Sequence, residues 1–100
     1  MGVMDPSTQL EFERHLEVAH AHANAARKQQ VQFWAELAES VPDLDKLFDI
    51  GSEVHTSTRQ AESHFHKCIE MNPNSTTVLR AYAAFVLDVL SDKAHVRSCV

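Results

Sequence analysis

Two prolines inside this chain limit what it can fold into, because they divide a helix-favouring sequence into three segments. Proline lacks a backbone donor and disfavours helical geometry in the preceding residue, so one helix ends near Pro42 and another near Pro73. Only two glycines and three prolines occur among 100 residues, which leaves the stretches between them free to form long helices. We predict helices over about residues 6–40, 44–71 and 76–90.

A capping residue stands at the start of each predicted helix. Asp5 precedes Pro6, and proline suits the first helical position because no donor is needed there. Asp43 directly precedes the second helix, and Asn74 or Ser75 precedes the third. These side chains accept hydrogen bonds from N–H groups that have no partner inside the first turn, so they define where each helix begins.

The first two predicted helices carry matching apolar seams. Apolar or small residues recur at alternating steps of three and four, with Gln30 as a polar interruption in the first helix. Gly51 occupies a seam position of the second helix and marks a kink or a close backbone contact. The short turn at Val41–Asp43 makes these two helices antiparallel neighbours. The seam positions are Phe12, Leu16, Ala19, Ala23, Ala26, Phe33 and Leu37, then Leu44, Leu47, Gly51, Val54, Thr58, Ala61, Phe65 and Cys68.

The third predicted helix has an apolar face wider than one contact needs, so we expect it to pack on two sides. Lys93 to Val100 resembles the opening of a fourth helix, which is too short to be stable alone. The predicted fold class is therefore all-α, with a long antiparallel hairpin plus a third helix in a single segment over residues 1–100. The apolar residues of the third helix are Val78, Leu79, Tyr82, Phe85, Val86, Val89 and Leu90.

Charge and composition exclude several classes of protein. A net charge of −5 argues against nucleic-acid binding, which requires a basic surface to meet phosphates. The first eight residues lack the basic and apolar stretches of a signal peptide, and the longest apolar run, Ala81 to Leu87, is far shorter than a membrane span. Cys68 and Cys99 are too few for a disulfide framework. We expect reduced thiols in a cytoplasmic segment that makes no direct membrane contact.

No catalytic, cofactor or metal site is expected from the residue pattern. Of the seven histidines, none forms the i, i+4 pair that chelates a metal on one helix face. His15 and His22 share a face but lie two turns apart. Cys68 and His64 are one turn apart, so a hydrogen bond between them is conceivable, but Cys68 fits better as a small core residue. The glycine-rich loop and the strand–turn–helix elbow of common catalytic sites are both missing from the sequence.

The residues around the second turn resemble a tetratricopeptide repeat, which is a pair of antiparallel helices. A small residue, an aromatic four later, a small residue three later and a proline five later are typical of the second helix of such a repeat. The next helix continues the resemblance at the positions where the class favours tryptophan, leucine, glycine and tyrosine, although the tryptophan and the glycine themselves are absent. The signature residues are Ala61, Phe65, Cys68, Pro73, Leu79, Tyr82, Ala83 and Val86.

A longer resemblance covers most of the chain and is to the repeat region of the TmcB/TmcC (tiny macrocysts) proteins. It is carried by Phe33-Trp34, Leu44 with Leu47, Ala61 with Phe65, the Asn72–Ser75 turn and the run from Val78 to Asp92. In that family the repeats accompany transmembrane segments and often PAS sensor domains. The resemblance implies a cytosolic piece of a membrane-associated signalling protein, and a role as a protein-interaction scaffold rather than an enzyme.

Two modes of association follow as hypotheses. By resemblance, the first helix of a repeat lines the binding groove, which directs Thr77, Arg80, Ala84 and Leu87 toward a protein partner. Arg80 would then pair with a carboxylate of that partner. The alternative is a self-associating structural element of coiled-coil type, in which copies meet through the exposed face of the third helix. The alanine-rich seam and Pro42 favour a hairpin within one chain over an isolated coiled coil.

Overall fold

The computed structural model describes residues 5–91, and within them the chain is entirely helical apart from its turns. Helix α1 spans Pro6–Leu37, α2 spans Leu44–Met71, α3 spans Thr76–Phe85, and a π-helical segment η1 continues α3 over Val86–Leu90. No strand occurs in these residues, so the predicted all-α class is confirmed. The predicted fourth helix, from about Lys93, lies outside the described residues.

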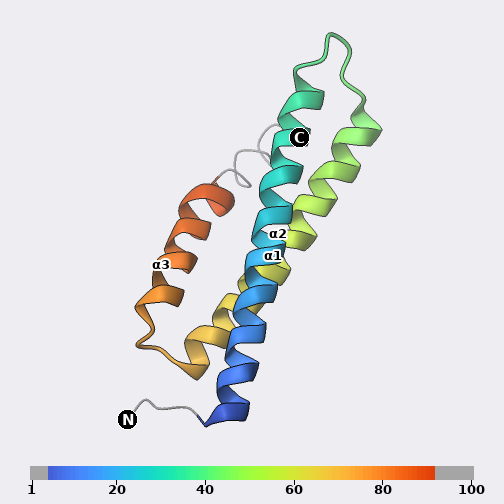
Figure 1. Cartoon of the computed structure of the whole chain (residues 1–100). Helices are drawn as coiled ribbons and strands as arrows, with labels where there is room; N and C mark the ends of the chain where they lie inside the picture. The colour runs from blue at the N-terminus through green and yellow to red at the C-terminus, as the bar shows by residue number, and fades with distance from the viewer. Residues whose placement is uncertain (1–4, 92–100) are drawn as a thin grey trace.

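Helices α1 and α2 form a long antiparallel hairpin, and α3 lies beside only part of it (Figure 1). The α1–α2 turn is at one end of the hairpin, and the α2–α3 turn is at the other (Figure 1). The hairpin makes the molecule elongated, with extents of 57 × 20 × 14 Å. We call the end covered by α3 the base and the end at the α1–α2 turn the tip.

Each helix begins at a side-chain cap. The Asp5 carboxylate accepts a hydrogen bond from the Thr8 N–H at 2.8 Å, and this bond holds the pKa of Asp5 below its usual value. Asp43 caps α2 through the Lys46 N–H at 3.3 Å. Of the two candidates for α3, Ser75 is the cap and accepts from the Val78 N–H at 3.4 Å.

Helix α1 ends at Leu37, earlier than the predicted end at about Ser40, and polar contacts then hold the turn. The Glu36 carboxylate accepts a hydrogen bond from the Asp43 N–H at 2.9 Å and pairs with the Lys46 ammonium at 3.2 Å. Both contacts favour the ionised carboxylate, so they lower the pKa of Glu36, the Asp43 N–H most strongly. The turn is therefore tied to the ends of both helices.

At the base, small residues on α1 and α2 let an aromatic cluster form between three helices. Phe65 lies with its ring centroid 5.4 Å from that of Phe85, and both side chains are buried. Gln30, the polar interruption in the α1 seam, donates from Nε2 to the Val89 carbonyl oxygen at 3.0 Å and so links α1 to η1. The buried apolar residues of this cluster are Ala19, Ala23, Ala26, Ala61, Phe65, Phe85 and Val89.

Among the described residues, the tip is formed by α1 and α2 alone, and larger side chains fill the space between them. Phe33 is fully buried and packs edge-on against Trp34, with ring centroids 5.4 Å apart. Leu37 and Trp34 cover this cluster from the α1 side. The buried residues of the tip cluster are Phe33, Leu47, Ile50 and Val54.

The structure differs from the sequence expectations at Leu44, at Gly51 and in the packing of the third helix. Leu44, expected in the α2 seam, is 70% exposed, whereas Ile50 is buried in the tip cluster. Gly51 makes no close contact, since a Cβ built there would meet nothing within 4 Å. Helix α3 packs on one side, through Val78, Phe85 and Val89, whereas Leu79 and Leu87 are exposed.

Candidate protein-interaction site

The face of α3 that turns away from the hairpin presents the predicted partner-binding residues. Thr77, Arg80 and Ala84 are all exposed and recur at steps of three and four, which places them on one side of the helix. Leu87 continues this row into η1 and is 72% exposed. The row therefore combines an apolar end with a guanidinium near its middle.

Contacts on the opposite side hold this face in place. Val78, Phe85 and Val89 are each 0% exposed and pack against the hairpin. Because these three anchors leave α3 little freedom to rotate, the exposed row is presented in a defined orientation. A preorganised surface loses less conformational entropy on binding than a mobile one.

The repeat-signature residues divide into a buried and an exposed group. Ala61, Phe65 and Cys68 on α2 are buried in the base. Those that follow the turn lie closer to the surface: Tyr82 and Val86 are half-buried, while Pro73, Leu79 and Ala83 are exposed. The first group holds the hairpin together. In the second group Tyr82 packs against the base cluster, with its ring centroid 5.8 Å from that of Phe65, while Leu79 and Ala83 are exposed on α3.

The thiol of Cys68 lies in the core and does not contact His64. Its Sγ donates to the Phe12 carbonyl oxygen at 3.7 Å, which links the two helices at the base. Burial raises the pKa of the Cys68 thiol, so the reactive thiolate is disfavoured. The hydrogen bond considered between Cys68 and His64 is therefore absent.

A histidine group at the α1–α2 interface is a feature that analysis of single helices missed. The Nδ1 atoms of His15 and His64 are 2.9 Å apart, so one neutral ring accepts a hydrogen bond from the other. The His22 ring stacks on His64 with centroids 6.2 Å apart. Burial, and then the charges of His15, His22 and Lys67, lower the pKa of His64.

The seven-residue spacing of His15 and His22 placed both rings on one face of α1, but the missing information was which α2 residue lies opposite. Within residues 5–91, no group of three or more histidine, cysteine, aspartate or glutamate side chains is arranged to hold a metal ion. The histidine group therefore acts through its hydrogen bond and its charge.

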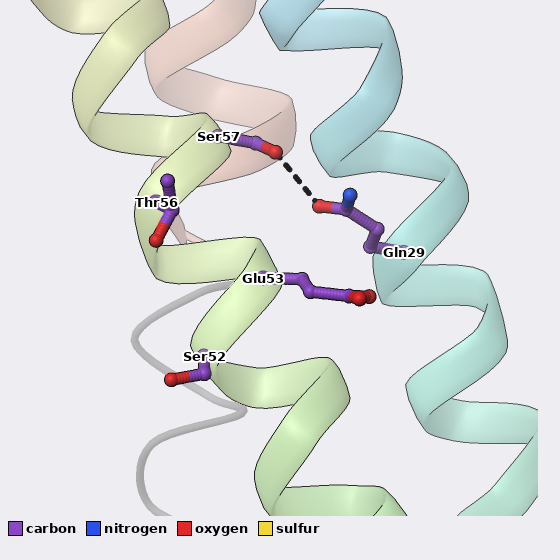
Figure 2. Close-up of a pocket in the computed structure, with 5 residues that line it drawn as sticks. All are labelled: Gln29, Ser52, Glu53, Thr56 and Ser57. Carbon is purple, nitrogen blue, oxygen red and sulfur yellow. Dashed lines mark hydrogen bonds between the residues drawn. The ribbon is translucent and has the colours of Figure 1, made fainter.

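A shallow polar depression lies between α1 and α2, next to the tip cluster (Figure 2). Figure 2 shows Ser57 and Glu53 pointing toward α1, and Ser52 pointing away. The Ser57 hydroxyl donates to Gln29 Oε1 at 2.9 Å. The lining residues contain no histidine, lysine or cysteine to act with Glu53 as an acid–base pair. This depression therefore offers hydrogen-bonding groups without recognisable catalytic machinery.

Comparison with known proteins identifies the repeat class. The family described as TmcB, TPR repeats, matches residues 2–99, which is nearly the whole chain. The chain belongs to this family. Tetratricopeptide repeats are helical modules that generally mediate protein–protein contacts and are typically non-catalytic.

Two curated relatives from Dictyostelium discoideum support the assignment. Tiny macrocysts protein B is 29% identical over 91 residues, covering 91% of this chain and 6% of the relative. Tiny macrocysts protein C is 28% identical over 90 residues, covering 90% of this chain and 6% of the relative. The chain thus spans about 6% of the length of these relatives. No solved structure matches it.

Within residues 5–91, no helix is both long and apolar enough to cross a bilayer.

Proposed function

We propose that this member of the TmcB repeat family is a protein-interaction scaffold whose partner docks on the outer face of α3. The observation that carries the proposal is the exposed row Thr77, Arg80, Ala84 and Leu87, presented by a helix that buries Val78 and Phe85 on its other side. A matching partner segment has an apolar side chain that covers Leu87 and a carboxylate that reaches Arg80.

The larger setting follows from the relatives. Because the chain corresponds to about 6% of the tiny macrocysts proteins, we propose that it acts as one module of a longer signalling protein. In this proposal the module is cytoplasmic and the parent protein is associated with a membrane. The module itself is not an enzyme, which agrees with the typical role of tetratricopeptide repeats.

A charge-reversal experiment tests the partner face. The double variant Arg80→Glu/Leu87→Ser should lose most of the partner that co-purifies with the intact chain, because it reverses the charge and removes the apolar contact. Its matched control is Arg59→Glu/Leu10→Ser, which makes the same changes at exposed positions of α2 and α1. Equal loss in both variants, or in neither, would contradict the proposal, provided that thermal melts show both to be folded.

Self-association through α3 is the second candidate, and the exposed leucines favour it. Leu79 and Leu87 are 43% and 72% exposed on α3 and η1, and covering them would remove apolar surface from water. Sedimentation velocity decides between the two. A dimer of the intact chain that dissociates in Leu79→Ser/Leu87→Ser supports self-association, whereas a monomer at all concentrations excludes it.

A further inference from the structure

A second surface, on α2 at the tip, has an apolar strip that the other residues within 5–91 leave uncovered. Leu44 and Phe48 are 70% and 63% exposed. Together with Gly51 they recur at steps of four and three, so they lie along one side of the helix. Leu47, Ile50 and Val54 on the adjacent side are buried in the tip cluster. We call Leu44, Phe48 and Gly51 the tip strip.

Gly51 is difficult to explain from contacts within the chain. A glycine inside a helix is less favourable than alanine, because it loses more backbone freedom on folding. Glycine allows another backbone to come close, yet a Cβ at Gly51 would meet nothing within 4 Å. The space over Gly51 is open, and Phe48, one helical turn earlier, is 63% exposed. A helix of another molecule that packs on the tip strip would supply the missing contact.

The charge of the chain is concentrated at the same place. Residues 36–53 contain six aspartates and glutamates and one lysine, whereas the rest of the chain contains eight acidic and eight basic residues. The net charge of −5 therefore belongs to the tip. Lys46 is already paired with Glu36, at 3.2 Å. The remaining carboxylates, all on exposed residues, are Glu39, Asp43, Asp45, Asp49 and Glu53.

We propose that the tip strip docks an amphipathic helix of a different protein, with an apolar stripe flanked by lysine and arginine. The apolar stripe would cover Leu44 and Phe48, its smallest residue would lie over Gly51, and its cations would meet the carboxylates of the tip. A second copy of this chain is disfavoured as the occupant, because it would bring two sets of five carboxylates together. This surface is separate from the α3 face and extends the proposed scaffold function to a second partner.

Binding of a defined peptide tests the proposal. The probe is a fluorescently labelled amphipathic helix built of leucine and lysine, titrated with the intact chain and followed by anisotropy, beside a matched leucine–glutamate helix. We expect the lysine peptide alone to bind. Phe48→Ser should lower the affinity for the lysine peptide about tenfold, as expected on loss of a central apolar contact. The double variant Asp45→Asn/Asp49→Asn should lower the affinity for the lysine peptide and make that affinity less dependent on salt.

Gly51→Ala separates binding from folding. Alanine should raise the melting temperature of the chain, because it improves helix propensity at an open position. It should also lower the affinity for the peptide, because its methyl group blocks close approach of the peptide backbone. Ser63→Ala is the control, at an exposed residue of α2 outside the tip strip, and should leave the affinity unchanged. A Gly51→Ala variant that binds as well as the parent would contradict the role given to Gly51.

Other outcomes would overturn the proposal as a whole. Equal binding of the glutamate peptide, or unchanged affinity in Phe48→Ser, would exclude an apolar and charge-complementary site. A dimer that Phe48→Ser converts to a monomer would make a second copy the occupant. Arg80→Glu/Leu87→Ser should keep its affinity for the peptide, so that failure of the α3 face and failure of the tip strip are told apart.

Discussion

Helices α1 and α2 pack against each other through different kinds of residue at the base and at the tip of the hairpin. At the base, alanines on α1 and α2 leave room for Phe65 and Phe85 to meet between three helices. At the tip, where α3 is not present, Phe33 and Leu47 fill the two-helix interface directly. Two helices enclose less volume than three, so fewer apolar side chains can be buried there. The tip accordingly keeps Leu44 and Phe48 on its surface and uses polar contacts to hold its turn.

This difference indicates separate roles for the two ends. The base is the cohesive part of the module, because side chains from every helix converge on one cluster. The tip is held by a smaller cluster and by the contacts of Glu36, and its outer surface is apolar and acidic. This packing implies that the base contributes more to the stability of the fold than the tip does.

The largest effect is expected from Phe65→Ala at the base. Removing this buried ring should lower the free energy of unfolding by about 3–5 kcal/mol, since the ring contacts α3 as well as its own hairpin. Urea denaturation followed by circular dichroism gives the value, with Leu87→Ala as an exposed control. Coincident curves for Phe65→Ala and the parent would show that the three-helix cluster does not hold the fold together.

Phe33→Ala makes the corresponding change at the tip. It should lower the free energy of unfolding by about 3 kcal/mol, which is the lower end of the same range. Phe33 packs between two helices only, and the neighbouring Trp34 can partly fill the space it leaves. Hydrogen exchange should show faster opening of the tip than of the base. A loss larger than that of Phe65→Ala, measured under the same conditions, would reverse the comparison.

Gln30→Leu tests the polar link between the hairpin and η1. The substitution removes the hydrogen-bond donor to the Val89 carbonyl oxygen. It should lower the free energy of unfolding by about 1–3 kcal/mol, even though leucine is a more apolar side chain for a buried position. Gln32→Leu makes the same change at an exposed position of α1 and should have little effect. If the two variants unfold at the same urea concentration, the Gln30 bond adds nothing to the base.

Asp43→Ala tests the capped turn at the tip. The substitution removes the acceptor for the Lys46 N–H and should lower the free energy of unfolding by about 1 kcal/mol. Asp43→Ser should retain most of the stability, because serine also caps a helix. A serine variant as unstable as the alanine variant would mean that the charge of Asp43, and not its capping bond, stabilises the turn.

The smallest effect is a pH dependence that originates on the base side of the hairpin. The pKa of His64 is lowered in the folded chain, so the unfolded chain binds more protons as pH falls through about 6.5, and stability falls with it. We expect the melting temperature to drop by a few degrees between pH 7.5 and about pH 5.5. His64→Gln should flatten this dependence and His66→Gln should not. An unchanged slope in His64→Gln would assign the effect to other groups.

Much of the fold could be predicted because it depends on local chemistry. Pro42 and Pro73 marked the two turns, and Asp5 and Asp43 cap their helices as the sequence indicated. The α1 seam was also predicted, including the polar position at Gln30. These features depend on residues within about one turn of each other, so they can be followed along a single chain.

The errors arose where a residue's neighbour comes from another element. Leu44 fits the α2 seam by spacing, but its side chain is 70% exposed. The partner of Gln30 is 59 residues away in sequence, and that of His15 is 49 away. Spacing shows which side of a helix is apolar, but it carries no information on what covers that side.

Within residues 5–91, the sequence by itself determined the three helical segments, the caps Asp5 and Asp43 and the hairpin, because these follow from backbone propensity and apolar periodicity. The tertiary structure alone decided that α3 covers one end of the hairpin and leaves the other bare. That choice depends on the combined volume of side chains from three helices, since α3 can come close only where alanines leave room for it. It is also what buries Gln30 and exposes the tip strip.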